Sequence, residues 1–187
     1  EHGFIGARMR MPRKIIMGYW QDEPVLRELG LWMRSAVGYA ESRSLKVMRF
    51  GDNMRNVAVT EGDKVEVQIK LGWQVNTWAV GDLVKEMAAV GDGEIDGLVD
   101  LYKEKYTVCT DDIEAIRYQA REEIAIKHML DREGAKAFTN TFEDLYGMEQ
   151  LPGFASQRLM EQGYGYGGEG DWKVAAMTRI VKAMTEG

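Results

Sequence analysis

One glutamate, in a glycine-rich loop, has small neighbours that would let it act as a metal ligand or as a general base. Glu169 lies within Gly163 to Gly170, a stretch that also holds Tyr164 and Tyr166. Small neighbours would let its carboxylate reach a cation or a polyol, as a ligand or as a proton acceptor. Asp171 follows as a candidate helix cap, and the N-terminus of a helix favours anions. On residue types alone, a solvated carboxylate in a surface loop is the favoured interpretation.

The same loop matches a nucleotide-binding pattern. The six residues from Gly165 to Gly170 read G-x-G-x-x-G. A dinucleotide fingerprint needs a strand before the loop, a helix after it and an acidic residue about 20 positions further on. We expect a helix before this loop, and the chain ends at Gly187 before such an acid could appear. The pattern therefore disfavours a nucleotide site.

Other candidate groups have simpler interpretations. Asp52 and Asp144 follow expected strands, where turn and cap chemistry explains such residues. His128 has no second His or Cys one helical turn away, so a packed or surface histidine is favoured. Cys109 has no flanking cation and no Cys-x-x-Cys partner, so we expect a structural cysteine.

Composition narrows the class of protein. The 187 residues carry 24 Lys and Arg against 30 Asp and Glu, a net charge of −6, which argues against nucleic acid as a partner. A single Cys excludes an intrachain disulfide and favours the cytoplasm. Only two His are present, which disfavours a His-rich metal site. No apolar run is long enough to cross a membrane, and no signal peptide is visible. The chain also lacks an initiator Met, so we expect it to begin partway along a longer gene product.

Hydrophobic periodicity predicts alternating strands and helices. Expected strands cover 14–20, 45–50, 75–80 and 137–142, and expected helices cover 22–41, 81–89, 94–106, 111–132, 152–162 and a segment starting after Asp171. The stretch 57–71 is ambiguous. Its alternating apolar residues favour a hairpin, and a short helix capped by Asp63 is the alternative.

This alternation predicts the fold class. Strands separated by helices indicate an α/β fold, a mostly parallel sheet with helices on both faces, in a flavodoxin-like or Rossmann-like three-layer arrangement. We expect one domain spanning residues 1–187. In such sheets ligands bind outside the carboxyl ends of the strands. That rule selects Gly51 to Met54, Gly81-Asp82 and Phe142 to Asp144.

Three groups of residues together carry a family resemblance. They are Gly3 to Arg10; Arg49-Phe50-Gly51-Asp52-Asn53-Met54-Arg55 with Asn76 to Leu83; and Thr141-Phe142-Glu143-Asp144-Leu145 with Gly167-Gly168-Glu169-Gly170-Asp171-Trp172-Lys173. In this order the chain closely resembles the middle portion, centred on the central domain, of bacterial L-arabinose isomerases. The resemblance extends over essentially the whole chain.

The resemblance implies an activity and a metal. Family members interconvert L-arabinose and L-ribulose, accept D-galactose more poorly, and use a divalent cation, typically Mn²⁺. They are hexamers of chains with N-terminal and central α/β domains and a β-rich C-terminal domain. Two Glu and two His hold the metal, and the family motif Gly-Glu-Gly-Asp-Trp places the first Glu at Glu169. The resemblance thus reverses the preference for a solvated side chain.

The family pattern also implies two substrate-binding residues. Met54 and Phe142 match positions that line the sugar pocket, and both lie where the strand-end rule points. Aldose–ketose isomerisation moves a proton between adjacent carbons through an enediol, which needs a carboxylate base and a cation on the sugar oxygens. Glu169 would be one of the two acid–base glutamates.

Much of the family site has no counterpart in these residues. The second Glu and both His of the pattern would lie beyond Gly187, and the N-terminal domain would lie before Glu1. We therefore expect a central-domain fragment that is inactive alone and binds Mn²⁺ weakly. The alternative is a self-standing flavodoxin-like module that binds an anion or a nucleotide, and a third is an assembly element with exposed docking faces.

Overall fold

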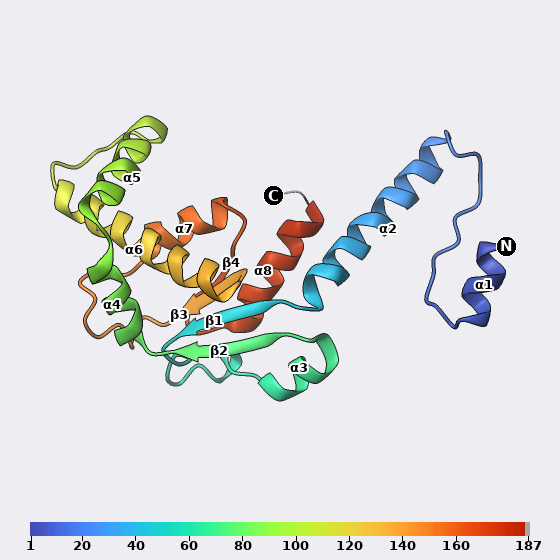
Figure 1. Cartoon of the computed structure of the whole chain (residues 1–187), viewed down its shortest axis with the longest axis horizontal. Helices are drawn as coiled ribbons and strands as arrows, with labels where there is room; N and C mark the ends of the chain where they lie inside the picture. Colours follow the sequence, from blue (N-terminus) through green and yellow to red (C-terminus); the bar gives the residue numbers. More distant parts are fainter. Residues whose placement is uncertain (186–187) are drawn as a thin grey trace.

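The computed structural model describes residues 1–185 and contains a parallel sheet of four strands (Figure 1). The strands are β1 (Lys46–Phe50), β2 (Gln74–Trp78), β3 (Ala137–Asn140) and β4 (Gly165–Gly167), in the order β2-β1-β3-β4. In the register, Phe50 at the end of β1 lies between Trp78 of β2 and Asn140 of β3. The carboxyl ends of these three strands therefore reach one edge together. The α/β prediction with a parallel sheet is confirmed.

Helices cover both faces, so the domain has three layers. Side chains of β1 alternate: Met48 and Phe50 pack with α4 (Val80–Ala89), α6 (Ile113–Glu133) and α7 (Gly153–Glu161), and Val47 faces α8 (Trp172–Thr185). Helix α5 (Asp92–Lys105) packs on the outer side of α6, and α2 (Glu23–Ser42) packs against α8. Trp172, fully buried, anchors the start of α8 against the sheet. Burial of such large side chains is worth roughly 1.5–3 kcal/mol each.

Several helix boundaries follow local capping signals. The side chain of Asp112 accepts a hydrogen bond from the Ala115 N–H at the start of α6, and Gly134 ends that helix with φ = +66°. Asp171 caps α8, because its carboxylate accepts the N–H groups of Lys173 and Val174 at 3.0 Å. These are the ends that the sequence pattern predicts.

The segment 57–71 is helical, so the hairpin interpretation is wrong. A 3₁₀ turn, η1 (Ala58–Thr60), precedes α3 (Lys64–Leu71). Asp63 caps α3 by accepting the Glu66 N–H at 2.9 Å, and Gly72 ends it with φ = +79°. Of its alternating apolar residues, only Val67 packs against the core. The caps at both ends favour the helix here, and they outweigh the strand preference of the alternating residues.

The strand expected at 14–20 is also absent. This segment connects α1 (His2–Arg8) to α2 without regular structure, and Ile15, Met17 and Trp20 are exposed. Figure 1 shows α1 and the first turns of α2 projecting away from the sheet. An apolar run becomes a strand only where a neighbouring strand can pair with it, and none of the strands in residues 1–185 lies beside this segment.

The helix expected before the glycine-rich loop is α7, and a short strand, β4, occupies Gly165–Gly167 within the loop. β4 separates α7 from α8. A Cβ atom at Gly165 would lie 2.1 Å from the Ala175 carbonyl oxygen, and one at Gly167 would lie 2.4 Å from that of Asp171. These glycines let the backbone of α8 approach β4, so close helix–strand packing accounts for them without a nucleotide.

Candidate functional site at the carboxyl edge of the sheet

Three loops meet where β1, β3 and β4 end. The Met54 N–H, in the loop after β1, donates to the Glu169 carbonyl oxygen in the loop after β4, at 2.9 Å. The Gly170 N–H donates to the carbonyl oxygen of Asn140, the last residue of β3, also at 2.9 Å. Backbone hydrogen bonds therefore join all three loops around the peptide that links Glu169 to Gly170.

Glu169 has a backbone conformation that few residues other than glycine adopt. Its φ is +61°, in the left-handed region, which costs roughly 1–3 kcal/mol at a non-glycine residue. The peptide that follows is held at its carbonyl oxygen by Met54 and at its N–H by Asn140. These two bonds oppose the strain and fix the point from which the partly exposed carboxylate projects.

Gly170 allows the loop after β1 to approach this peptide. A Cβ atom at Gly170 would lie 2.5 Å from both the Asp52 carbonyl oxygen and the Asn53 Cα, and its φ is +79°. No other amino acid fits there without displacing backbone. The contact places the loop that carries Met54 directly on the residue after Glu169.

The predicted sugar-wall residues lie at the same edge. The Phe142 ring tip lies 3.8 Å from the position of a Cβ at Gly168, and half of the Phe142 side chain is exposed. The Tyr166 hydroxyl approaches the same point at 4.0 Å and donates to Asn140 Oδ1 at 2.7 Å. Met54 is partly buried on the other strand-end loop. Met54 thus contacts the loop of Glu169 through its backbone N–H, and Phe142 lies beside Gly168 of the same loop; their binding role stays a prediction.

An ion pair ties the loop after β3 to the loop after β1. The Arg55 backbone N–H and its side-chain Nε both donate to Glu143 Oε2 at 3.0 Å. These contacts, with the backbone hydrogen bond as the largest cause, hold the pKa of Glu143 below its ordinary value. Glu143 is therefore charged, and its carboxylate is paired with Arg55.

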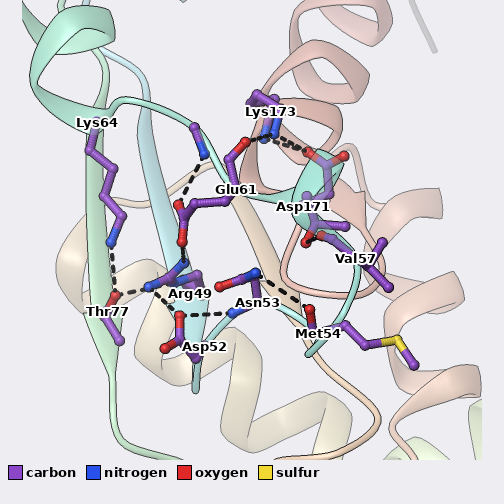
Figure 2. A network of polar contacts seen from close by, with 12 residues as sticks. Arg49, Asp52, Asn53, Met54, Val57, Glu61, Lys64, Thr77, Asp171 and Lys173 are labelled. Atoms are coloured by element: carbon purple, nitrogen blue, oxygen red, sulfur yellow. Dashed lines mark hydrogen bonds and ion pairs between the residues drawn. The ribbon is translucent and has the colours of Figure 1, made fainter.

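A polar network that the sequence interpretation missed lies behind the loop of Met54 (Figure 2). Arg49, only 5% exposed on β1, contacts Thr77 of β2 and the carboxylates of Asp52 and Glu61. Asp52 also accepts the Asn53 N–H at 2.9 Å, which agrees with the predicted turn role. A signal was present, because Arg49 stands between the apolar residues Met48 and Phe50 in the interior of a buried strand, where a charged side chain needs partners.

A shallow hollow of about 470 Å³ opens beside this network, between the ends of β1 and β2. Its polar lining comes from Arg49, Asp52, Thr77 and Asp144. The Asp144 carboxylate lies 2.6 Å from the place a Cβ would take at Gly51, whose φ is +77°. The hollow is large enough for a small polar molecule.

Within residues 1–185, no three His, Cys, Asp or Glu side chains cluster in a way that could hold a metal ion. Glu169 supplies one oxygen donor at the strand-end loops. His128 lies on α6 beside Glu86 and Glu94, and Cys109 is exposed and free. A manganese site at Glu169 would therefore need ligands from outside the described residues. In the same range, no helix is long and apolar enough to cross a bilayer.

Fold and geometry together define a parallel α/β domain whose strand ends meet at the Glu169–Gly170 peptide, the usual position of a ligand site in this class. Residues 46–187 match the family model of the L-arabinose isomerase central domain, and residues 1–44 match that of the L-arabinose isomerase N-terminal domain. The chain belongs to the L-arabinose isomerase family. The boundary between the two matches falls between α2 and β1.

Similar proteins agree with this assignment. The chain is 54% identical over 193 residues to the L-arabinose isomerases of Salmonella newport and Salmonella typhimurium. It is 55% identical over 189 residues to L-arabinose isomerase 1 of Bacillus licheniformis. All of this chain is covered in each comparison, against 39% of the Salmonella proteins and 38% of the Bacillus protein. The chain thus spans about two fifths of the length of the curated relatives it matches.

Proposed function

We propose that the protein built from this chain interconverts L-arabinose and L-ribulose, with D-galactose as a poorer substrate. Family membership supports a sugar isomerase, and one observation in the structure carries the assignment of the site. The peptide after Glu169 is held by hydrogen bonds to Met54 and Asn140 where three strand-end loops meet. Such positioning is what a carboxylate needs in order to act on a defined carbon or cation.

The proposed reaction is a proton transfer between adjacent sugar carbons through an enediol. Glu169 would accept or return the proton, or hold the cation, from a backbone that is already fixed. Phe142 and Met54 would form an apolar wall that orients the sugar and excludes water. We also propose that Glu169 is one ligand of a Mn²⁺ ion, which when bound would polarise the sugar oxygens.

Further features belong to the same proposal. Homo-oligomeric assembly as a hexamer and residence in the cytoplasm rest on the resemblance to the family. Residues 1–187 would form the part of the enzyme that carries Glu169, with no isomerase activity alone. The self-standing anion- or nucleotide-binding module has less support, since helix packing accounts for Gly165 and Gly167.

The test compares Glu169→Gln with the unchanged protein, both expressed from the complete gene. Glutamine keeps the size of the side chain but removes its charge and its basicity. We expect kcat to fall by about 10²–10⁴-fold and the affinity for Mn²⁺, measured by electron paramagnetic resonance, to fall as well. Glu114→Gln, at an exposed position on α6, is the matched control and should change neither quantity. Wild-type turnover of L-arabinose by Glu169→Gln would contradict the proposal.

A further inference from the structure

A buried guanidinium lies behind the loop that carries Met54. Arg49 Nε donates to Thr77 Oγ1 at 3.2 Å, its Nη2 pairs with Asp52 at 2.9 Å and its Nη1 pairs with Glu61 at 3.4 Å. Figure 2 shows these three contacts converging on Arg49 from β2 and from the two ends of segment 52–61. A buried cation is tolerated only when its charge and its donors have partners, and Arg49 has three.

The contacts of Arg49 fix both ends of one segment. Asp52 begins segment 52–61 and Glu61 ends it, and both carboxylates bind the same guanidinium. Glu61 is held in its charged form, since the Gly62 N–H, followed by the charge of Arg49, lowers its pKa. Because β1 and β2 hold Arg49 through strand pairing and Thr77, the segment is anchored to the sheet.

A second cation holds the segment from the opposite side. Lys173 Nζ, in the first turn of α8, donates to the carbonyl oxygen of Val59 at 2.8 Å and to that of Glu61. It also lies 3.7 Å from the carboxylate of Asp171, the cap of α8. Segment 52–61 is therefore attached to β1 by Arg49 and to the start of α8 by Lys173.

The segment in turn holds Glu169. Its Met54 N–H binds the Glu169 carbonyl oxygen, and its Asp52 and Asn53 backbone packs on Gly170. The left-handed φ of +61° at Glu169 persists only where the surroundings enforce it. A shift of the segment would release this peptide and turn the carboxylate away from its position.

We infer that Arg49 is a positioning residue for Glu169, acting through Asp52 and Glu61 to hold segment 52–61 against the Glu169–Gly170 peptide. It acts without contacting the sugar or the metal. This role rests on the proposed function, because it assigns Arg49 to the site at which Glu169 binds Mn²⁺. Loss of groups that orient a metal ligand typically lowers metal affinity or activity 10- to 100-fold.

The experiment uses Arg49→Lys in the protein expressed from the complete gene. Lysine keeps the charge but has no planar fork, so it cannot hold Thr77, Asp52 and Glu61 at once. We expect kcat to fall 10- to 100-fold and the dissociation constant for Mn²⁺ to rise by a similar factor, with KM changing less. Added guanidinium should partly restore the kcat of Arg49→Ala.

Arg158→Lys is the matched control. Arg158, on α7, is also a buried guanidinium, only 4% exposed, and it pairs with Glu123 and Glu161 away from the strand-end loops. Both lysine variants should lower the melting temperature, and only Arg49→Lys should change the kcat and Mn²⁺ affinity of the folded protein. Equal Mn²⁺ affinity and equal kcat in the two variants would overturn the inference.

Two other variants can replace Arg49→Lys, and Glu169→Gln separates a failure of this inference from a failure of the proposed function. If Arg49→Lys does not fold, Asp52→Asn and Glu61→Gln take its place, each removing one contact of Arg49. Both should weaken Mn²⁺ binding in the same direction, and unchanged binding in both would overturn the inference. If Glu169→Gln leaves both the turnover of L-arabinose and Mn²⁺ binding unchanged, the proposed function fails. If Glu169→Gln abolishes Mn²⁺ binding and the Arg49 variant does not affect it, only the role of Arg49 fails.

Discussion

Gly170 and Gly168 lie on either side of Glu169 and meet different surroundings. A Cβ at Gly168 would have only ordinary contacts, at 3.8 Å from Phe142 and 4.0 Å from Tyr166. A Cβ at Gly170 would overlap the backbone of Asp52 and Asn53 at 2.5 Å, and Gly170 also has a positive φ. Only Gly170 is therefore required by the approach of segment 52–61, although both glycines belong to the same sequence motif.

The two glycines give a matched pair of substitutions. Gly170→Ala should lower the free energy of unfolding by about 1–3 kcal/mol, because it adds strain and displaces backbone. It should also lower kcat, since the Met54–Glu169 hydrogen bond would be lost. Gly168→Ala should lower the melting temperature much less. Thermal denaturation and L-ribulose formation measure both effects, and equal melting temperatures for the two variants would contradict this account.

Among the elements, α6 carries an unusual buried acid. Glu122 is fully buried, and neither of its carboxylate oxygens has a hydrogen-bond partner in the described part of the chain. Burial away from water disfavours the charged form and raises the pKa of Glu122 to about 8. The neighbouring Glu123 is also buried, but it accepts a hydrogen bond from the Tyr102 hydroxyl and pairs with Arg158. Two adjacent glutamates on one helix thus have opposite electrostatic surroundings.

This difference makes stability depend on pH. Folded Glu122 keeps its proton up to about pH 8, and in the unfolded chain it releases the proton near pH 4.5. Its stabilising contribution is therefore present below pH 4.5 and is lost as the pH rises through 8. Glu122→Gln cannot ionise, so it should raise the free energy of unfolding above pH 8 by about 1–3 kcal/mol. At pH 4 the effect should be small.

Thermal denaturation from pH 4 to pH 9 measures the effect of Glu122→Gln. Glu114→Gln, at an exposed position of the same helix, is the control and should shift the melting temperature little at any pH. An advantage of Glu122→Gln that is the same at pH 4 and pH 9 would show that Glu122 does not titrate in this range.

At the scale of the whole molecule, the strand-end site has one proposed metal ligand, Glu169, and no complete ligand set within residues 1–185. Residues 1–185 contain no cluster of three metal-binding side chains. The N-terminal part is also exposed: α1 buries none of its side chains, and α2 is amphipathic and packs mainly against α8. Apolar residues at Leu26, Trp32 and Met33 face outward. These features agree with a chain that matches two domain models and about two fifths of its relatives' length.

We therefore expect the 187-residue chain alone to show no conversion of L-arabinose and only weak Mn²⁺ binding. A single carboxylate lacks the several ligands on which affinity for a divalent cation depends. Isothermal titration calorimetry with Mn²⁺ and an assay for L-ribulose measure the two quantities, with the protein from the complete gene as the comparison. Stoichiometric, tight Mn²⁺ binding by the 187 residues would contradict the assignment of Glu169 as one ligand among several.

Sequence patterns were enough to predict what depends on local physical chemistry. The caps at Asp112, Gly134 and Asp171 follow from neighbouring residues, and so does the alternation of helices and strands that predicts a parallel sheet. The motif around Glu169 placed the candidate site, because the residue types themselves carry the family resemblance. The strand-end rule selected the loops of Met54 and Phe142 independently of that resemblance.

Only the tertiary structure decided what depends on partners distant in the chain. The segment 14–20 resembles a strand but pairs with no strand in the described part of the chain, and 165–167 is a strand because β3 lies beside it. The role inferred for Arg49 depends on Thr77 and Glu61, which folding brings to its guanidinium. The strained backbone of Glu169 depends on Met54 and Asn140 in the same way. Such pairings are long-range, and no local propensity or spacing encodes which groups will meet.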